Sequence, residues 1–287
     1  MIKFTKRNLL LYFKDKGSVF FSLLSVMIAF LLYIIVFRNL YGGGALSSGF
    51  DIKGITDAWA IGGILAAPTI STPLGALWVY VDDRKRKLYR DFFTAPVPRW
   101  KITGGYLISS FLIGVIMSCA LLIATQIYLV SVGGELFSLT QILAILGIII
   151  ISTFSGAGFV LFVISLFPSN NAYTCCSLVI GTLVGFLTSN YVPIGMLPES
   201  IQTFIKCTPI AHTSALLRQI ICMEPIEKIF STLPPGFNTE NFTEYMGIEF
   251  SFGDCFVEPW LHVAILVGSG IIFYALAILG MNKKRKN

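Results

Sequence analysis

LTQILAILGIIIISTFSGAGFVLFVISLF, residues 139–167, contains no Asp, Glu, Lys or Arg. A bilayer core about 30 Å thick is crossed by about 20 apolar residues of α-helix, and one charged side chain near the helix centre costs about 3 kcal/mol. A run of this length and composition therefore predicts a helix that spans a membrane. Because the run exceeds the minimum length, the helix should tilt or extend beyond the lipid.

Five more apolar runs also contain no Asp, Glu, Lys or Arg. The six runs are residues 19–37, 58–81, 102–132, 139–167, 172–192 and 260–281. Of the 287 residues, 55% are hydrophobic and only 13% are charged, whereas soluble domains have about 25% charged residues. We therefore expect an all-α membrane protein with six transmembrane helices, forming a single domain over residues 1–287.

The basic residues predict the orientation. With six spans, one side of the membrane receives segments 1–18, 82–101, 168–171 and 282–287. These segments hold 16 of the 21 Lys and Arg residues and 4 of the 15 acidic residues, so their formal charge is +12 and that of the remainder is −6. Positively charged segments stay in the cytoplasm. We therefore expect both termini to be cytoplasmic in a bacterial plasma membrane, with headgroups rather than nucleic acid beside the basic clusters.

The N-terminal segment, residues 1–18, predicts an amphipathic elbow helix before the first span. Ile2, Leu9 and Phe13 fall near one helical face, whereas the lysines lie elsewhere. Such a pattern is typical of a helix that lies on the inner membrane surface.

The segment between spans 2 and 3, residues 82–100, predicts a short cytoplasmic helix over residues 82–93. Asp82 and Asp83 suit the start of a helix, because carboxylates are favoured at the positive end of the helix dipole. Prolines that follow would end it. Within span 2 itself, Pro68 and Pro73 predict kinks.

Residues 193–222, after span 5, predict two short helices. Pro198 followed by Glu199 favours the start of one, and Thr208 followed by Pro209 the start of the other. Each is expected to be too short to cross a bilayer, which indicates an outer re-entrant hairpin between spans 5 and 6. Residues 223–258 then hold seven acidic residues and one Lys, and are expected to form an acidic extracellular loop.

Two of these segments resemble the ABC-2 type transporter permeases. RKRKLYRDFFTAPVPRWKITGGYL, residues 84–107, is similar to the family's coupling segment, and YVPIGMLPESIQTFIKCTPIAHTSALLRQI, residues 191–220, is similar to its outer hairpin. The resemblance implies a permease subunit that pairs with a second copy or a paralogue and with a separate nucleotide-binding ATPase. It also implies outward transport of a hydrophobic or amphipathic substrate, such as a drug, an antimicrobial peptide or a lipid-linked compound.

The resemblance further implies two sets of site residues. The set that would couple to the ATPase is Asp83, Arg84, Tyr89, Arg90, Phe92, Phe93 and Pro96. The set that would form the outer gate is Pro193, Leu197, Pro198, Pro209 and Arg218. ATP and Mg²⁺ are expected on the partner subunit and no cofactor on this chain, because the phosphate-binding pattern GxxxxGK[ST] is absent from its sequence. By itself the chain is not expected to be an enzyme.

The remaining chemistry in the sequence is sparse. His212 and His262 are far apart along the chain, without a metal or nucleophile motif nearby, and are interpreted as structural residues, so no metal site is expected. Cys222 and Cys255 bracket the acidic loop, and a disulfide between them is one possibility, with free thiols the other.

Three other functions stay open as alternatives. An ion-coupled secondary transporter normally uses carboxylates or histidines within its spans, and the six runs contain only His262. A polysaccharide or lipid exporter of the same family would have the same architecture. A membrane enzyme or sensor would need a nucleophile, a metal cluster or a signalling element, none of which the sequence indicates.

The charge distribution generates a topology prediction. Single cysteines introduced at residues 83, 170 and 284 of a cysteine-free variant should react with thiol reagents only from the cytoplasmic side, and a cysteine at residue 240 only from outside. Cytoplasmic labelling at residue 240 would contradict the orientation.

Overall fold

The computed structural model describes residues 1–37, 53–88, 98–167, 170–231, 239–252 and 255–283. Its first elements are α1 (Ile2–Lys14), α2 (Lys16–Leu32), the π-helical turn η1 (Tyr33–Phe37), α4 (Lys53–Ala66), α5 (Pro68–Ala76), α6 (Trp78–Lys85) and α8 (Arg99–Ser131). Those that follow are α9 (Leu139–Leu166), α10 (Asn170–Leu187), the 3₁₀ turn η2 (Ile194–Met196), α11 (Glu199–Lys206), α12 (Pro209–Phe230), α13 (Thr239–Tyr245), β1 (Ser251–Phe252), β2 (Cys255–Phe256) and α14 (Pro259–Lys283).

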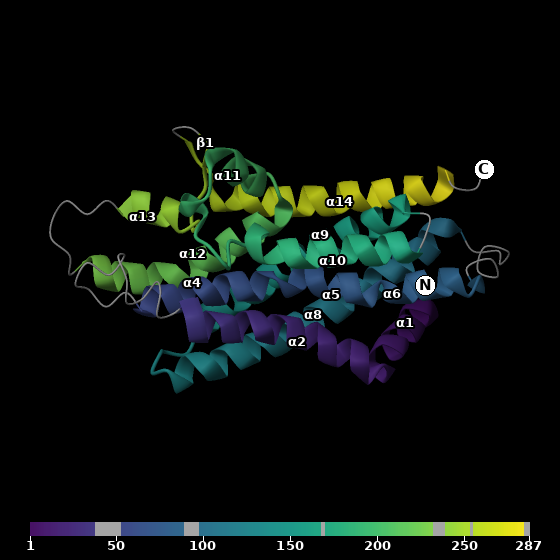
Figure 1. Cartoon of the computed structure of the whole chain (residues 1–287), viewed down its shortest axis with the longest axis horizontal. Coiled ribbons are helices and arrows are strands. Elements are labelled where there is room, and N and C mark those ends of the chain that lie inside the picture. The colour runs from purple at the N-terminus through teal and green to yellow at the C-terminus, as the bar shows by residue number, and fades with distance from the viewer. Residues whose placement is uncertain (38–52, 89–97, 168–169, 232–238, 253–254, 284–287) are drawn as a thin grey trace.

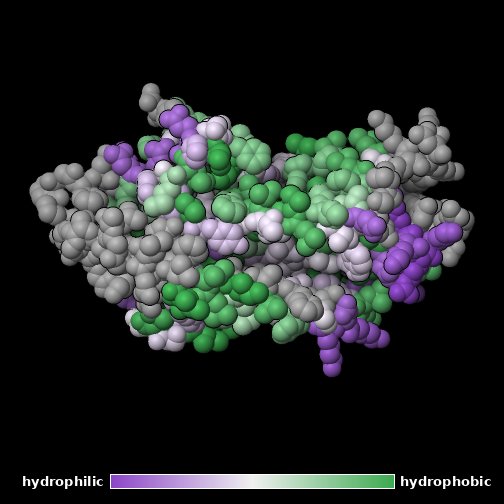
Figure 2. Space-filling model, in the orientation of Figure 1, coloured by the Kyte–Doolittle hydropathy of each residue, from purple (hydrophilic) through white to green (hydrophobic). Residues whose placement is uncertain are grey.

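The long helices lie side by side along one axis of the molecule (Figure 1). The N-terminus, α6 and the C-terminal end of α14 lie at one end of this axis, whereas α13 lies at the other. Figure 2 shows hydrophobic side chains over the middle of the visible face and hydrophilic side chains gathered toward both ends. This distribution is the one that a bilayer around the middle of the molecule requires.

Four segments of the described chain are long and apolar enough to cross a membrane. They are Gly54–Lys85, Trp100–Ser131, Leu139–Leu166 and Pro259–Gly280. The first apolar run of the sequence forms α2 and η1, and the fifth forms α10, a shorter apolar helix. The helical fold is therefore confirmed, and the total of six spans stays a prediction.

Helix α10 ends earlier than the predicted fifth span, at Leu187 instead of residue 192. Ser189 adopts a φ of +50°, the left-handed conformation that ends many helices. The amide of Ser189 donates to the carbonyl of Phe186 and the amide of Asn190 to that of Gly185, both at 2.9 Å. These two bonds satisfy carbonyls at the helix end, so α10 stops while the sequence is still free of charged residues.

Span 2 is divided into three helical pieces. The break at Ala67 lies directly before Pro68, as predicted, and the break at Leu77 lies one turn after Pro73. Proline has no N–H, so Pro73 cannot donate to the carbonyl of Thr69 one turn earlier. That carbonyl faces Gly156 of α9, where a Cβ atom would lie only 2.2 Å from its oxygen. The kinked span therefore packs backbone to backbone against α9.

Helix α1 forms over the segment predicted to be helical. The face of α1 that contacts the rest of the protein is a stripe of residues with polar groups. Thr5, Asn8 and Tyr12 are buried, mainly against α8, whereas Ile2 and Phe13 are exposed. Leu9, the third residue of the expected apolar face, packs against a small core cluster. Contact of Ile2 and Phe13 with lipid stays a prediction. The sequence pattern did not indicate the face that docks on the bundle, because that face includes the polar residues Thr5 and Asn8.

The segment after span 5 differs from the prediction in one respect. Helices α11 and α12 begin where the prolines predicted, with Pro209 in the first turn of α12. However, α12 has 22 residues and continues through Pro225 to Phe230, so it is not a short helix and includes the start of the predicted acidic loop. The loop also contains α13 and an antiparallel ribbon in which Ser251 pairs with Phe256 and Phe252 with Cys255.

The contact between α5 and α9 generates a stability prediction with a matched control in the same helix. Gly156→Ala should lower the unfolding free energy by about 1–3 kcal/mol, because its Cβ meets a backbone oxygen that has little freedom to move. Gly147→Ala should instead be neutral or stabilising, since nothing lies within 4 Å of its Cβ position and alanine favours helix. Thermal unfolding of the purified chain measures both. Equal effects of the two substitutions would contradict the close approach.

Candidate functional site

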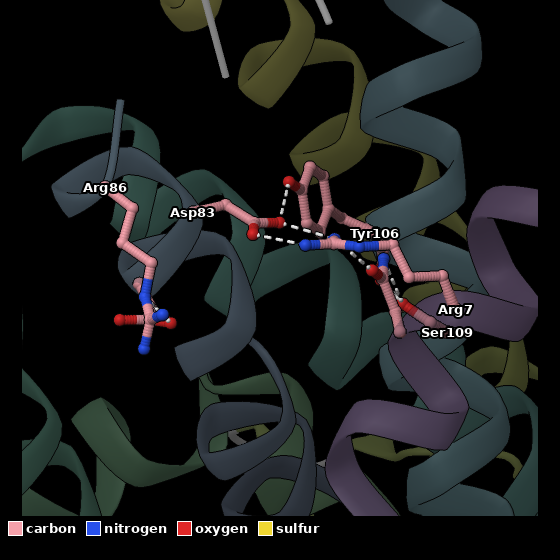
Figure 3. Close-up of polar contacts among 7 residues, drawn as sticks. Arg7, Asp83, Arg86, Tyr106 and Ser109 are labelled. Atoms are coloured by element: carbon pink, nitrogen blue, oxygen red, sulfur yellow. Dashed lines mark hydrogen bonds and ion pairs between the residues drawn. The ribbon is translucent and has the colours of Figure 1, made fainter. Parts of the chain in front are cut away.

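Three residues from separate helices form a polar cluster at the end of the bundle that contains the N-terminus. Because the predicted orientation places this end of the bundle in the cytoplasm and the opposite end outside, we call Arg7, Asp83 and Tyr106 the inner anchor (Figure 3). Arg7 of α1 donates from Nη1 and Nη2 to the two carboxylate oxygens of Asp83 in α6, at 2.7 and 2.6 Å. The hydroxyl of Tyr106 in α8 donates to Asp83 Oδ2 at 2.7 Å. Each Asp83 oxygen is thus hydrogen-bonded in a geometry that fits Arg to a carboxylate.

The inner anchor connects the elbow helix α1 to α6 and α8, the helices on either side of the predicted coupling segment. Asp83 is 2% exposed and the Arg7 side chain is 33% exposed, so the pair lies at the edge of the protein interior. The hydrogen bond to Asp83 raises the pKa of Arg7 above its usual value. Asn8 strengthens the contact, because its amide donates to Ser109 of α8 at 3.3 Å. These contacts therefore tie the end of α6 to α1 and α8, and α1 to α8.

Asp83 does not begin a helix, contrary to the sequence prediction. Asp82 and Asp83 lie in the last turn of α6, which continues span 2 to Lys85. Asp83 is buried, and its role in coupling to the ATPase stays a prediction. Arg84 turns toward α9, where its Nη1 donates to the carbonyl of Phe167 at 2.7 Å.

The other residues predicted to couple to the ATPase lie outside the described part of the chain. They are Tyr89, Arg90, Phe92, Phe93 and Pro96. Their role stays a prediction.

A second polar centre lies where α12 crosses α4. We call Arg218, Trp59 and Ser189 the outer anchor. Arg218 is completely buried, donates from Nε to the carbonyl of Trp59 at 3.2 Å and from Nη2 to that of Ser189 at 3.0 Å, and lies over the Trp59 ring at 4.5 Å. Carbonyl dipoles and the π face of the ring compensate its charge. Arg218 thereby holds the left-handed end of α10 against α4.

Two consecutive glycines make room for the outer anchor. A Cβ atom at Gly62 would lie 2.7 Å from Arg218 Cγ, and one at Gly63 would lie 2.8 Å from its Nη2. Trp59 is fixed in turn, because its indole N–H donates to the carbonyl of Met246 at 2.6 Å. The outer segment after α13 is thus linked to span 2 through the same tryptophan.

The remaining predicted gate residues form the frame of this region. Pro193 is buried directly before η2, Pro198 precedes α11, and Pro209 occupies the first turn of α12. Leu197 packs against a small core cluster around Ile194. Only Arg218 of the five reaches another span through polar contacts among the described residues.

The two histidines meet although they are 50 residues apart in sequence. Nδ1 of His212 in α12 lies 2.6 Å from Nδ1 of His262 in α14, so one ring donates a hydrogen bond to the other. Both side chains are buried, and the ring of Phe250 packs 5.6 Å from each. The interpretation of each histidine in isolation missed this pair. No signal in the sequence identified it.

The structure leaves both thiols of the predicted Cys222–Cys255 disulfide free. Cys222 is completely buried in the core cluster between α4 and α12, whereas Cys255 is exposed on β2. The possibility of a disulfide was based only on the positions of the two cysteines on either side of the acidic loop, and the structure buries one of these thiols while it leaves the other exposed.

Comparison with protein families gives a match over residues 51–279, to the family described as ABC-2 family transporter protein. The chain belongs to this family. The matched region includes α4, α12 and most of the structure between them, so it contains both Asp83 and Arg218. A comparison with curated proteins gave no match. In ABC-2 systems this membrane domain is the permease component, which works in the bilayer with a separate ATPase subunit.

The inner anchor of this ABC-2 permease generates a stability prediction. Arg7→Met should lower the unfolding free energy by about 2 kcal/mol, because it leaves the buried Asp83 carboxylate without its cation, although solvent near Arg7 reduces the loss. Arg86→Met is the control: Arg86 pairs at 2.9 Å with Asp82, but its side chain is 68% exposed, so the loss should stay below about 0.5 kcal/mol. Thermal unfolding in detergent distinguishes them.

Adding Asp83→Asn tests whether the pair itself is responsible. In a double-mutant cycle, the Arg7→Met substitution should cost much less in the Asp83→Asn background, because the two side chains interact directly. Additive effects would show that the contact contributes nothing to stability.

Proposed function

We propose that this ABC-2 permease exports a hydrophobic or amphipathic compound, with energy from ATP that a separate subunit hydrolyses. Membership of the ABC-2 family supports the permease role. The outward direction, the class of substrate and the pairing of two permeases in one transporter are parts of the proposal. The excess of basic residues at the N-terminal end of the bundle supports a cytoplasmic position for the ATPase contact.

One observation supports this mechanism most directly: span 2 connects the two anchors. Its outer piece, α4, contains Trp59 of the outer anchor, and its inner piece, α6, contains Asp83 of the inner anchor. The proline breaks divide the span between them. Because a helix piece moves as a rigid unit and bends at such breaks, a displacement at the ATPase can reach the outer anchor along one span.

The ATPase contact is proposed for residues 82–93, a segment that begins with Asp82 and with Asp83 of the inner anchor. Asp83 fixes the base of this segment to α1 and α8. Tyr89, Phe92 and Phe93 would be the apolar groups that enter a cleft on the ATPase. Aromatic side chains commonly contribute most of the binding energy at such contacts, and exposed charges contribute little.

The structure provides one observation in favour of an ion-coupled transporter. Asp57, which lies outside the predicted span 2, is included in α4 and is buried, with Tyr33 donating to its carboxylate at 2.8 Å. Transport that stops when a protonophore is added while ATP is maintained would favour this alternative. We favour ATP coupling because of the family match.

The test of the proposed function replaces the aromatic residues of the coupling segment. Phe92→Ala and Phe93→Ala should each weaken association with the ATPase subunit at least about tenfold and reduce transport, since truncation of buried aromatics commonly costs 2 kcal/mol or more. Lys85→Ala and Lys87→Ala are controls, because headgroups can neutralise those charges and their loss should matter less. Co-purification from membranes and ATP turnover of the reconstituted complex provide the readouts.

Each outcome is informative. The aromatic variants should still insert and unfold at the wild-type temperature. If both retained wild-type association while Lys85→Ala abolished it, the assignment of the contact would be wrong. If no ATPase subunit co-purified with the wild-type chain, the proposed function itself would fail.

A further inference from the structure

The buried histidine pair, His212 and His262, takes no part in the proposed mechanism. The two Nδ1 atoms lie 2.6 Å apart, the ring centroids lie 4.8 Å apart, and the residues are 2% and 0% exposed. A hydrogen bond between two Nδ1 atoms needs one atom that carries a hydrogen and one that has none. The observed contact therefore requires at least one of the two rings to be neutral.

The pair joins two helices that pack mainly on other neighbours. His212 is the fourth residue of α12, and His262 is the fourth residue of α14. Helix α12 packs mainly on α4, whereas α14 packs mainly on α9. Among the described residues, the histidine contact is the only hydrogen bond between side chains of α12 and α14. Its loss would therefore weaken the junction between the starts of the two helices and leave the main contact of each in place.

The surroundings of the two rings are apolar. Phe250 packs 5.6 Å from each ring and belongs to the core cluster around Ile194. The polar groups that interact with the rings are backbone groups of Lys206 and Val257, which carry no net charge. Burial and the neighbouring ring accordingly lower the pKa of His212 below its usual value. A protonated ring would place a charge in this interior, which is costly when no opposite charge is close.

The charged side chains of α11 and of the segment before β1 have other contacts. Lys206 donates from Nζ to the carbonyl of Ser251 at 2.9 Å, and the same Nζ lies 3.5 Å from Glu244. The carboxylate of Glu249 accepts a hydrogen bond from Thr243 at 2.6 Å. These contacts hold the nearest charges of the outer segment away from the rings.

The other elements around the pair add no charge to it. Glu199 at the start of α11 and Glu258 directly before α14 are exposed. Arg218 of α12 belongs to the outer anchor, and the remaining charged residues of α12 lie in its last two turns. On α4, Asp57 accepts a hydrogen bond from η1 at 2.8 Å. Helices α9 and α10 contain no Asp, Glu, Lys, Arg or His, and those of α8 lie in its first turn.

We propose that the histidine pair is a pH-sensitive contact, which holds the start of α12 on α14 at neutral pH and releases it when the rings take up protons. With both rings protonated, each Nδ1 carries a hydrogen and neither can accept one, while two positive charges lie side by side. Water can then reach the rings only if the helices separate. Release is a property of the permease alone, and only its effect on export rests on the proposed function.

The geometry determines the sign and the steepness of the pH dependence. The packed arrangement favours neutral rings, so the contact is most stable at neutral pH and weakens as the pH falls below about 6.5, the usual pKa of histidine. Release takes up as many as two protons. The ratio of released to packed molecules should therefore rise by up to about 100-fold per pH unit, whereas one titrating group gives at most about tenfold.

The test measures protonation and helix separation in phosphatidylcholine nanodiscs. The chain contains two histidines, so ¹³C labelling of the imidazoles gives two NMR signals that report their protonation. Spin labels in a cysteine-free variant, at Ser200→Cys of α11 and Ala264→Cys of α14, report the separation, since both positions are exposed. A control pair at Ile150→Cys of α9 and Ala264→Cys reports the contact of α9 with α14.

Between about pH 7 and pH 4, both imidazole signals should change together, and the distance from residue 200 to residue 264 should lengthen over the same interval. The control distance should stay constant. His212→Asn combined with His262→Asn should abolish the lengthening, because asparagine keeps hydrogen-bonding groups but does not titrate. Either substitution alone should reduce the steepness to at most about tenfold per pH unit. Glu258→Gln, which removes an exposed acid near the start of α14, should leave it unchanged.

Three results would overturn the proposal. The first is separate titration of the two imidazoles near pH 6.5, and the second is joint titration without any lengthening. The third is lengthening that the double Asn variant retains, because carboxylates would then be responsible. If the distance lengthens as expected but no ATPase subunit associates with the chain, the pH-sensitive contact stands and the export function falls.

Discussion

A backbone carbonyl that lacks a hydrogen bond inside a bilayer must be covered by protein. The prolines of span 2 create such a carbonyl in the middle of the molecule. Pro73 cannot supply an N–H to the carbonyl of Thr69, and Gly156 allows α9 to approach that carbonyl closely. The kink therefore requires α9 as its neighbour. From this fixed middle, α4 extends to α12 and α6 extends to α1, so the arrangement of both anchors follows from the contact between α5 and α9.

The two anchors compensate buried charge in different ways. Asp83 is matched by a guanidinium group that remains partly in solvent, which keeps the desolvation of the pair modest. Arg218 has no ion pair among the described residues and instead meets two carbonyl oxygens and an indole ring.

The sequence predicted features that depend on lipid or on chain-local chemistry. The charge-free run at residues 139–167 became α9 with its start at Leu139, Pro68 correctly marked a break in span 2, and Pro209 correctly marked the start of a helix. Contacts between distant segments could not be predicted in this way. Two neighbouring acids after an apolar run favour the start of a helix through the helix dipole, whereas in the structure the ion pair with Arg7 accompanies burial of Asp83 in the last turn of α6.

Other residues of the candidate site were missed for the same reason. The histidine pair depends on the crossing of α12 and α14, which no local pattern encodes. Helix α12 continues past Pro225 although proline usually ends a helix, because its remaining turns pack on the core around α4. The alternation of apolar and polar residues in α1 predicted an amphipathic helix, but the hydrogen bonds of Asn8 could not be predicted from it.

The inner anchor also has a consequence for how the chain is assembled during synthesis. Arg7 and its partner Asp83 are 76 residues apart in sequence, and Tyr106 follows 23 residues later. The ribosome therefore releases the N-terminal helix long before its binding site on the bundle exists. Until the second and third hydrophobic segments have entered the membrane, α1 cannot form these hydrogen bonds, and only its apolar side chains can hold it at the lipid surface. Docking of α1 thus marks the moment at which the first three segments have met.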